Sequence, residues 1–233
     1  MRTKCKGENM LKAKDFRDRA WNHLGDSWGS KVWGTFALIA LVYLAISAAC
    51  GGLSEIGIGV AATIIVSGPL EMGITTASLN VVRGEELKFE NLFDGFKNMG
   101  STLVLWLLNT IFTFLWALLF VIPGIVKAYA YSMSFFILRD NPQMSQSEAR
   151  RMSIDMMTGN KWRLFCLDFS FIGWGLLCAL TFGILSVWVL PYIRTAHAEF
   201  YQSLIDRAVS NDTSDTEVIE EAPAEPFDNS ETV

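Results

Sequence analysis

The sequence predicts an all-helical, polytopic membrane bundle of six transmembrane helices, arranged as three hairpins. Three apolar stretches, over 32–82, 101–138 and 164–205, are each long enough for two helices across a hydrocarbon core of about 30 Å. Lys and Arg gather in the segments that flank these stretches and are missing from the Gly- or Pro-containing midpoints. Alternating basic and non-basic connections are typical of helices that cross a membrane repeatedly, so both termini are predicted to be cytoplasmic.

Composition agrees with this fold class, because 51% of the residues are hydrophobic and the mean hydropathy is +0.31. The predicted spans cover about 32–50, 56–82, 101–121, 125–138, 164–181 and 184–203. Turns are expected at Pro123-Gly124 and at Gly183. Pro69 and Pro191 lie inside the second and sixth spans, where the missing backbone donor should kink each helix.

A short amphipathic helix is predicted before each hairpin, the first of them over about 11–25. The apolar faces consist of Ala13, Phe16, Ala20 and Leu24 in the first helix, Leu92, Phe93 and Phe96 in the second, and Ala149, Met152 and Met156 in the third. The third begins with a capping box at Ser145 and Glu148, and Gly159 follows it. Such helices lie in the headgroup plane of a membrane, so we expect an interfacial position. The pattern indicates either a weak threefold repeat or a coincidence common in membrane sequences.

The charge divides the chain into a membrane domain, 1–206, and an acidic tail, 207–233. The first part has a net charge of +2 and the tail of −7. The tail contains two prolines and almost no large apolar residues, so it is predicted to be disordered. It either aids solubility or docks to a partner.

Ionisable residues inside predicted spans are the candidate functional groups, because a charge in hydrocarbon is costly. They are Glu71, Lys127, Asp168, Arg194 and His197. Glu71 is the deepest and needs a partner, for which Lys127 and Arg194 are available. The pair is then either a structural ion pair or part of a transport or proton-coupled site. For the other four, a structural role is the simpler interpretation.

No enzyme is predicted, because metalloprotease, hydrolase and phosphate-loop motifs are all missing from the sequence. Four cysteines lack metal-type spacing and the two histidines lie in separate regions, so neither a metal nor another cofactor is expected. Basic residues follow the membrane boundaries instead of forming one patch, which argues against nucleic-acid binding.

The second half of the chain carries a set of motifs that resembles one known family. These are Ile122–Lys127, Tyr131–Met133, Asp140–Pro142, Met156–Lys161, Leu167–Trp174, Thr181–Ile184, Pro191-Tyr192 and Thr195–Tyr201. Together they resemble the bacterial integral membrane family known as domain of unknown function 975. Arg139 departs from the small or apolar residue usual there. The resemblance implies a bacterial cytoplasmic (inner) membrane protein and no established activity.

Two functions fit these observations. The first is a non-enzymatic envelope adaptor or scaffold that binds membrane lipids or a membrane-protein partner through its amphipathic helices and acidic tail. The alternative is a small transporter or lipid-handling protein, since proline-broken helices beside charged residues are where transporters bind substrate. A polar cavity around Glu71 would favour the alternative.

Overall fold

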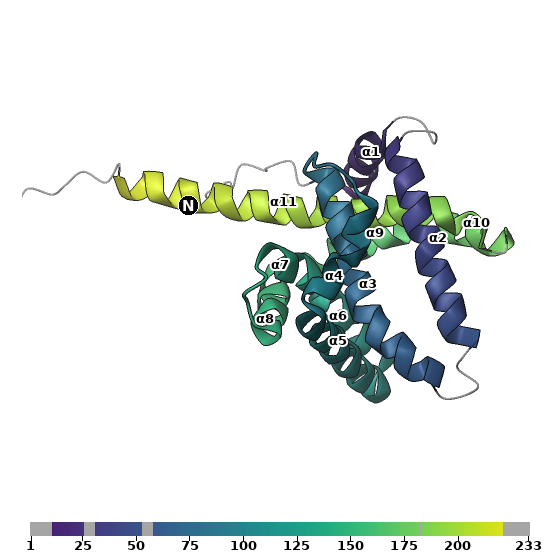
Figure 1. The fold of residues 1–233 in the computed structure, drawn as a ribbon. Coiled ribbons are helices and arrows are strands. Elements are labelled where there is room, and N and C mark those ends of the chain that lie inside the picture. The colour runs from purple at the N-terminus through teal and green to yellow at the C-terminus, as the bar shows by residue number, and fades with distance from the viewer. Residues whose placement is uncertain (1–10, 26–30, 53–57, 182, 221–233) are drawn as a thin grey trace, which may run out of the picture.

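The computed structural model describes residues 11–25, 31–52, 58–181 and 183–220, and every regular element in these ranges is a helix (Figure 1). In chain order they are α1 (Ala13–Leu24), α2 (Lys31–Gly52), α3 (Ile58–Val82), the 3₁₀ helix η2 (Phe89–Phe93), α4 (Asp94–Lys97), α5 (Met99–Leu119), α6 (Val121–Tyr131), α7 (Ser134–Asp140), α8 (Gln146–Met156), α9 (Lys161–Ser170), α10 (Ile172–Leu180) and α11 (Ser186–Glu220). The prediction of an all-helical chain is confirmed for these residues.

Three stretches of the described residues are long and apolar enough to cross a membrane, namely Met99–Leu119, Val121–Asp140 and Lys161–Leu180. Many large apolar side chains on them are exposed, including Leu118 at 73% and Leu180 at 76%. Water would make such exposure costly, whereas lipid tails solvate it. These helices therefore suit a membrane protein, although they supply three of the six spans that the sequence predicts.

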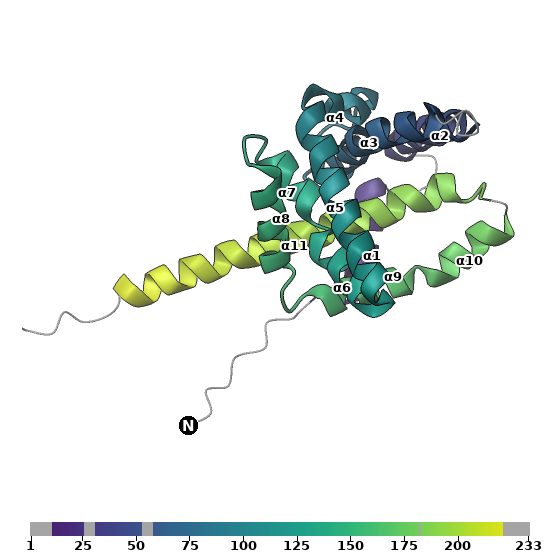
Figure 2. The same ribbon diagram turned by 90° about the horizontal axis from the view of Figure 1, so that it is seen from below.

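Helix α3 is the centre of the structure and packs against α2, α5, α11 and the η2–α4 segment. The longest helix, α11, crosses this group and its C-terminal half projects away from the other helices in both views (Figures 1 and 2). The core lies where α3 and α11 meet α7 and α1, with Ile137, Leu79 and Phe200 fully buried. The two helices at the centre are therefore also the two that carry Glu71 and Arg194.

The apolar face of α1 packs on protein, which corrects the expectation that this helix lies on the membrane surface. Phe16, Ala20 and Leu24 are buried against α11 and its neighbours, and the rings of Phe16 and Phe200 are 5.3 Å apart. Burial against another helix removes the same apolar area from water as burial in lipid does. Periodicity alone cannot distinguish these two partners.

The connection between α5 and α6 also differs from the prediction of a turn at Pro123-Gly124. The chain reverses at Phe120, the one extended residue between the two helices (φ −155°, ψ 135°). Pro123 belongs to the first turn of α6, where its missing N–H costs nothing. A Cβ on Gly124 would lie 2.7 Å from the Cα of Ala117, so this glycine lets the two helices approach closely.

The fourth predicted span, 125–138, is an interrupted helix, because the α-helical hydrogen-bond ladder breaks between α6 and α7. Ser153 on α8 bridges the interruption. Its hydroxyl donates to the Ala130 carbonyl (2.8 Å) and accepts from the Met133 N–H (3.2 Å), and its side chain is fully buried. A hydroxyl that satisfies both backbone groups makes the break tolerable in a buried setting.

Helix α8 begins as predicted, with reciprocal hydrogen bonds between Ser145 and Glu148. Of its predicted apolar face, Ala149 is buried and Met152 is 42% exposed. In the second predicted amphipathic segment, Leu92 is buried under α3 and Phe93 is 43% exposed. These faces are therefore shared between the protein core and the surroundings.

The predicted fifth span, 164–181, is divided into α9 and α10, and α11 continues beyond the end of the predicted sixth span, 184–203. Gly159 and Gly183 both have positive φ, 79° and 85°, in the turns before α9 and α11. Pro69 lies inside α3 and Pro191 inside α11, and both helices continue through them. Helix α11 runs to Glu220, well into the tail that the sequence predicts to be disordered. Once its packed half has formed, each further turn needs only propagation and no costly nucleus. Residues 221–233 lie outside the described ranges.

Candidate functional site

Glu71 and Arg194 form a two-pronged ion pair between α3 and α11. Arg194 donates through Nη1 to Glu71 Oε1 and through Nη2 to Oε2, the second at 3.1 Å. The Arg194 side chain is 33% exposed and the Glu71 side chain is 25% exposed. Of the two partners that the sequence offers for Glu71, the structure brings Arg194 to it. Planar guanidinium and carboxylate groups fix each other's orientation in this geometry.

Lys127 lies elsewhere, on the face of the Trp116 ring, with its Nζ 4.9 Å from the ring centre. This contact joins α5 and α6 close to their connection at Phe120. A cation over an indole face is stabilised by the ring quadrupole without a carboxylate. Lys127 is therefore not part of the group that surrounds Glu71.

His197 and Asp168, two further candidates, are hydrogen-bonded to each other next to the ion pair. His197 Nε2 and Asp168 Oδ1 are 2.6 Å apart, and the Tyr129 hydroxyl donates to Asp168 Oδ2 at 2.9 Å. His197 follows Arg194 by three residues, so both project from one face of α11. The chain Tyr129–Asp168–His197 joins α6, α9 and α11 and offers a short path for a proton.

A cavity of about 650 Å³ lies between α3, α5, α6, α7 and α11 and contains both the ion pair and His197. Its lining is Glu71, Thr75, Trp106, Asn109, Thr110, Thr113, Phe114, Ala117, Ala128, Tyr131, Ser132, Phe135, Phe136, Arg194 and His197. Charged and hydroxyl groups thus share the cavity with aromatic and small apolar side chains. This mixture suits an amphipathic molecule better than a simple ion.

Helix α5 supplies a polar stripe to this cavity that sequence reasoning missed. Asn109, Thr110 and Thr113 lie at helical spacing inside an otherwise apolar span. Asn109 donates weakly to Ser134 Oγ (3.4 Å), and its Oδ1 is buried without a hydrogen-bond partner among the described residues. An unsatisfied buried amide oxygen is unusual and available to a bound donor. A search for uncharged polar residues at helical spacing in each span would have found it.

Glu199, which the sequence analysis also missed, holds α1 in place. It is 5% exposed, and its Oε1 lies 2.6 Å from His23 Nε2 on α1. It lies in the sixth predicted span, so the rule that selected Arg194 and His197 applies equally to it. Because Glu199 does not line the cavity, its role is to dock α1 onto α11.

A hydrogen-bond network centred on Asp140 joins three elements at one end of the helix group. Arg83 binds both carboxylate oxygens (2.8 and 2.7 Å), and Tyr201 donates to Oδ2 (3.0 Å). The hydrogen bond to Asp140 raises the pKa of Arg83 above its ordinary value, so the guanidinium stays charged. Arg83, Asp140 and Tyr201 come from α3's end, α7 and α11, so this network ties three elements together.

The described residues contain no group of three or more His, Cys, Asp or Glu side chains placed to hold a metal ion. Cys166 and Cys178 are both free thiols. What the cavity does offer is a fixed pair of opposite charges and a histidine that can change its protonation.

Comparison with known proteins identifies one family. Residues 118–208 match the model of the family described as "Protein of unknown function (DUF975)". No curated protein and no solved structure matches the chain. The matched segment includes Lys127, Tyr129, Asp168, Arg194 and His197, whereas Glu71 and Asn109 lie before it. Over residues 118–208, from the end of α5 into α11, this chain carries the domain of unknown function 975.

Proposed function

We propose that this chain is a non-enzymatic, multi-pass protein of the bacterial cytoplasmic membrane that binds a small amphipathic, lipid-like molecule and moves it within or across the bilayer. The binding site is the cavity around Glu71 and Arg194. The observation that carries this proposal is a two-pronged ion pair that lines a cavity of about 650 Å³ together with aromatic side chains. Charges in a bilayer are costly to keep and commonly mark a substrate pathway.

The arrangement of the helices around the cavity supports a transport role. Glu71 follows Pro69 by two residues, and Arg194 follows Pro191 by three. Proline removes the backbone hydrogen bond to the carbonyl four residues earlier, so each helix has a weak point within about one turn of its charge. Transporters commonly bind substrate beside helices that are weakened or broken near a charge, and α3 and α11 are of the weakened kind, since both stay helical through their prolines.

His197 adds a means to couple this movement to protons. It lines the cavity one helical turn from Arg194 and contacts Asp168, which in turn accepts from Tyr129. A proton added to His197 would place a second positive charge next to Arg194 and would strengthen the attraction of the cavity for an anionic headgroup. Loss of that proton would then favour release of the headgroup.

Six spans arranged as three hairpins, with both termini cytoplasmic, are the topology proposed for this function. It combines the candidate spans Met99–Leu119, Val121–Asp140 and Lys161–Leu180 with α2, α3 and the first half of α11. Substituted cysteines test it in a variant whose four native cysteines are replaced by serine. A cysteine at Lys127 should react with an impermeant maleimide from outside intact cells, and one at Lys88 only after permeabilisation. Equal labelling of both positions in intact cells would reject the topology.

Reconstituted liposomes test the function itself. Wild-type protein should expose a fluorescently tagged phosphatidylethanolamine of the inner leaflet to external dithionite faster than empty liposomes do. Glu71→Gln should lower that rate to background, because Arg194 is then left without its carboxylate. Glu86→Gln removes an equally charged group whose side chain is 85% exposed, and should not change the rate.

Entrapped pyranine in the same liposomes reports whether protons move with the lipid. Wild-type and Glu71→Gln protein that both give background signals in the two assays would overturn the proposal. The adaptor or scaffold interpretation stays a prediction, and the cavity adds no argument for it. A crosslinking experiment on membranes, with full-length protein and a variant lacking 208–233, examines that alternative directly.

A further inference from the structure

A second cavity, of about 310 Å³, lies at the opposite end of α3 from its start, between α3, α4, α5 and α7. It is lined by Met72, Thr76, Asn80, Asp94, Lys97, Asn98, Ser101, Thr102, Leu138, Arg139 and Pro142. None of these residues lines the cavity around Glu71. The second cavity is therefore a different site from the one proposed for transport.

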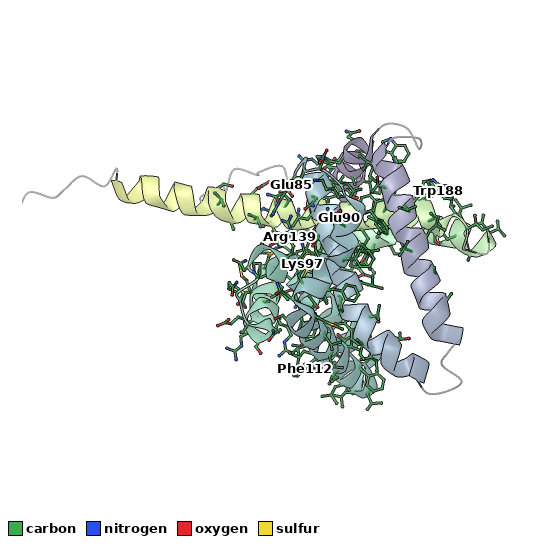
Figure 3. The ribbon with its side chains drawn as sticks, viewed as in Figure 1. Glu85, Glu90, Lys97, Phe112, Arg139 and Trp188 are labelled. Carbon is green, nitrogen blue, oxygen red and sulfur yellow. The ribbon has the colours of Figure 1, made fainter. Side chains whose placement is uncertain are left out.

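Two cations reach this second cavity from different elements, Lys97 from α4 and Arg139 from α7 (Figure 3). Lys97 Nζ contacts Asp94 Oδ1 at 2.7 Å, and its side chain is 79% exposed. Arg139 donates to Asn80 Oδ1 (2.5 Å) and to Asp140 Oδ1 (3.0 Å). Together with Asp94, the charged side chains that line the cavity sum to one positive charge.

Arg139 is the cation that the fold can spare for a ligand. Asp140 already receives two hydrogen bonds from Arg83 and one from Tyr201. Glu85, the remaining acidic contact of Arg139, is 3.4 Å away and its side chain is half exposed. An anion in the cavity can therefore recruit Arg139 while Asp140 keeps its other partners and the half-exposed Glu85 is left to solvent.

The N-terminus of α5 points into the same space. Asn98 is the residue before this 21-residue helix, makes no side-chain cap, and lines the cavity with Ser101 and Thr102 of the first turn. The first N–H groups of a helix lack intrahelical partners and carry a partial positive charge. Helix N-termini of this kind bind phosphate and sulfate groups.

Thr76 gives an independent indication that this cavity accepts a ligand. Its residue exposure is 7%, it lines the cavity, and its hydroxyl oxygen has no hydrogen-bond partner among the described residues. A threonine inside a helix ordinarily donates to a carbonyl one turn earlier, as Thr75 does to the Glu71 carbonyl at 2.8 Å. The hydroxyl of Thr76, a residue that lines the cavity, thus has a donor that no described residue uses.

We propose that this cavity binds a phosphate group, contributed by a phospholipid headgroup or by a free phosphate compound. Backbone N–H groups of α5 and the Thr76 hydroxyl donate to the phosphate oxygens, and Lys97 and Arg139 balance its charge. Charge-assisted hydrogen bonds to phosphate are among the stronger polar contacts in proteins. The volume of the cavity suits a headgroup better than a whole lipid.

The test uses full-length purified protein and two probes. The first is inorganic phosphate, compared with chloride at equal ionic strength and read as the shift in thermal unfolding temperature. The second is phosphatidylglycerol added to delipidated protein and counted by native mass spectrometry. Lys97→Gln should weaken binding of the responsive probe by about tenfold, the effect of one lost charge-assisted hydrogen bond.

Lys88→Gln is the matched control, since Lys88 is also an exposed lysine with a carboxylate neighbour but does not line the cavity. Thr76→Val provides a second variant that keeps the shape and every charge, and it should weaken binding as well. A response to phosphate alone identifies a free phosphate compound, and a response to the lipid alone identifies a headgroup. Binding of neither probe, or equal loss in Lys97→Gln and Lys88→Gln, would overturn the proposal.

Discussion

Arg194 on α11 binds both carboxylate oxygens of Glu71 on α3, across a separation of 123 residues along the chain. This contact joins the two helices that form the centre of the structure, and it lines the larger cavity. It therefore has two effects that mutation can separate, one on stability and one on the proposed transport.

Removal of one partner of this pair should cost more stability than removal of both. Glu71→Gln or Arg194→Gln leaves an uncompensated charge in a half-buried site, which we expect to cost about 2 kcal/mol of unfolding free energy. The double variant leaves no charge and should be more stable than either single variant. Thermal unfolding in detergent measures the three differences. Costs that simply add in the double variant would show that the two side chains are not coupled.

Ser153→Ala should destabilise the protein by about 1–3 kcal/mol, because the Ala130 carbonyl and the Met133 N–H lose their buried partner. Hydrogen exchange at the α6–α7 interruption should rise in the same variant. Ser147→Ala, an exposed position on the same helix α8, serves as the control and should change little. A loss of the same size in both variants would contradict the bridging role.

Gly124→Ala should separate α5 from α6 and cost about 1–3 kcal/mol, since its new methyl group meets the backbone of Ala117. The matched control is Gly175→Ala on α10, where no atom lies within 4 Å of the added carbon. That change should be neutral or slightly stabilising, because alanine favours the helix. Unfolding temperatures of the two variants compare a crowded helical glycine with an open one.

The start of α8 should respond to acid. The hydrogen bond from the Ser145 hydroxyl, followed by that from its backbone N–H, lowers the pKa of Glu148 below its ordinary value of 4.5. A lowered folded-state pKa adds stability that is present above the ordinary value and is lost as the pH falls through the lowered one. The protection of the α8 amides, measured relative to their intrinsic exchange rates, should therefore fall below about pH 4.5.

Ser145→Ala should already show fast exchange in α8 at neutral pH and should respond less to acid, because the largest cause of the shift is gone. Exchange in α5, which lies outside the capping box, provides the internal reference. An unchanged acid response in Ser145→Ala would mean that Glu148 is held by other contacts.

Features that depend on near neighbours in the chain were the ones that sequence reasoning predicted well. The capping box at Ser145 and Glu148 forms as expected, and α7 ends at Asp140, two residues beyond the predicted end of the fourth span. The reversal at Phe120 was missed because a proline in the first turn of a helix and a proline in a loop look alike in sequence. Asn109 and Glu199 were missed although their positions inside apolar spans are visible in the sequence.

What the sequence determined by itself is the all-helical class and the apolar stretches, because helix periodicity and span length depend only on residues within a few turns. Only the tertiary structure decided that Glu71 binds Arg194 while Lys127 lies on Trp116, and that the apolar face of α1 meets α11. In each case the sequence allows an alternative of similar chemistry: Lys127 in place of Arg194 for Glu71, and lipid in place of α11 for the apolar face of α1. The packing of helices far apart in the chain selects between them, and no local pattern records that selection.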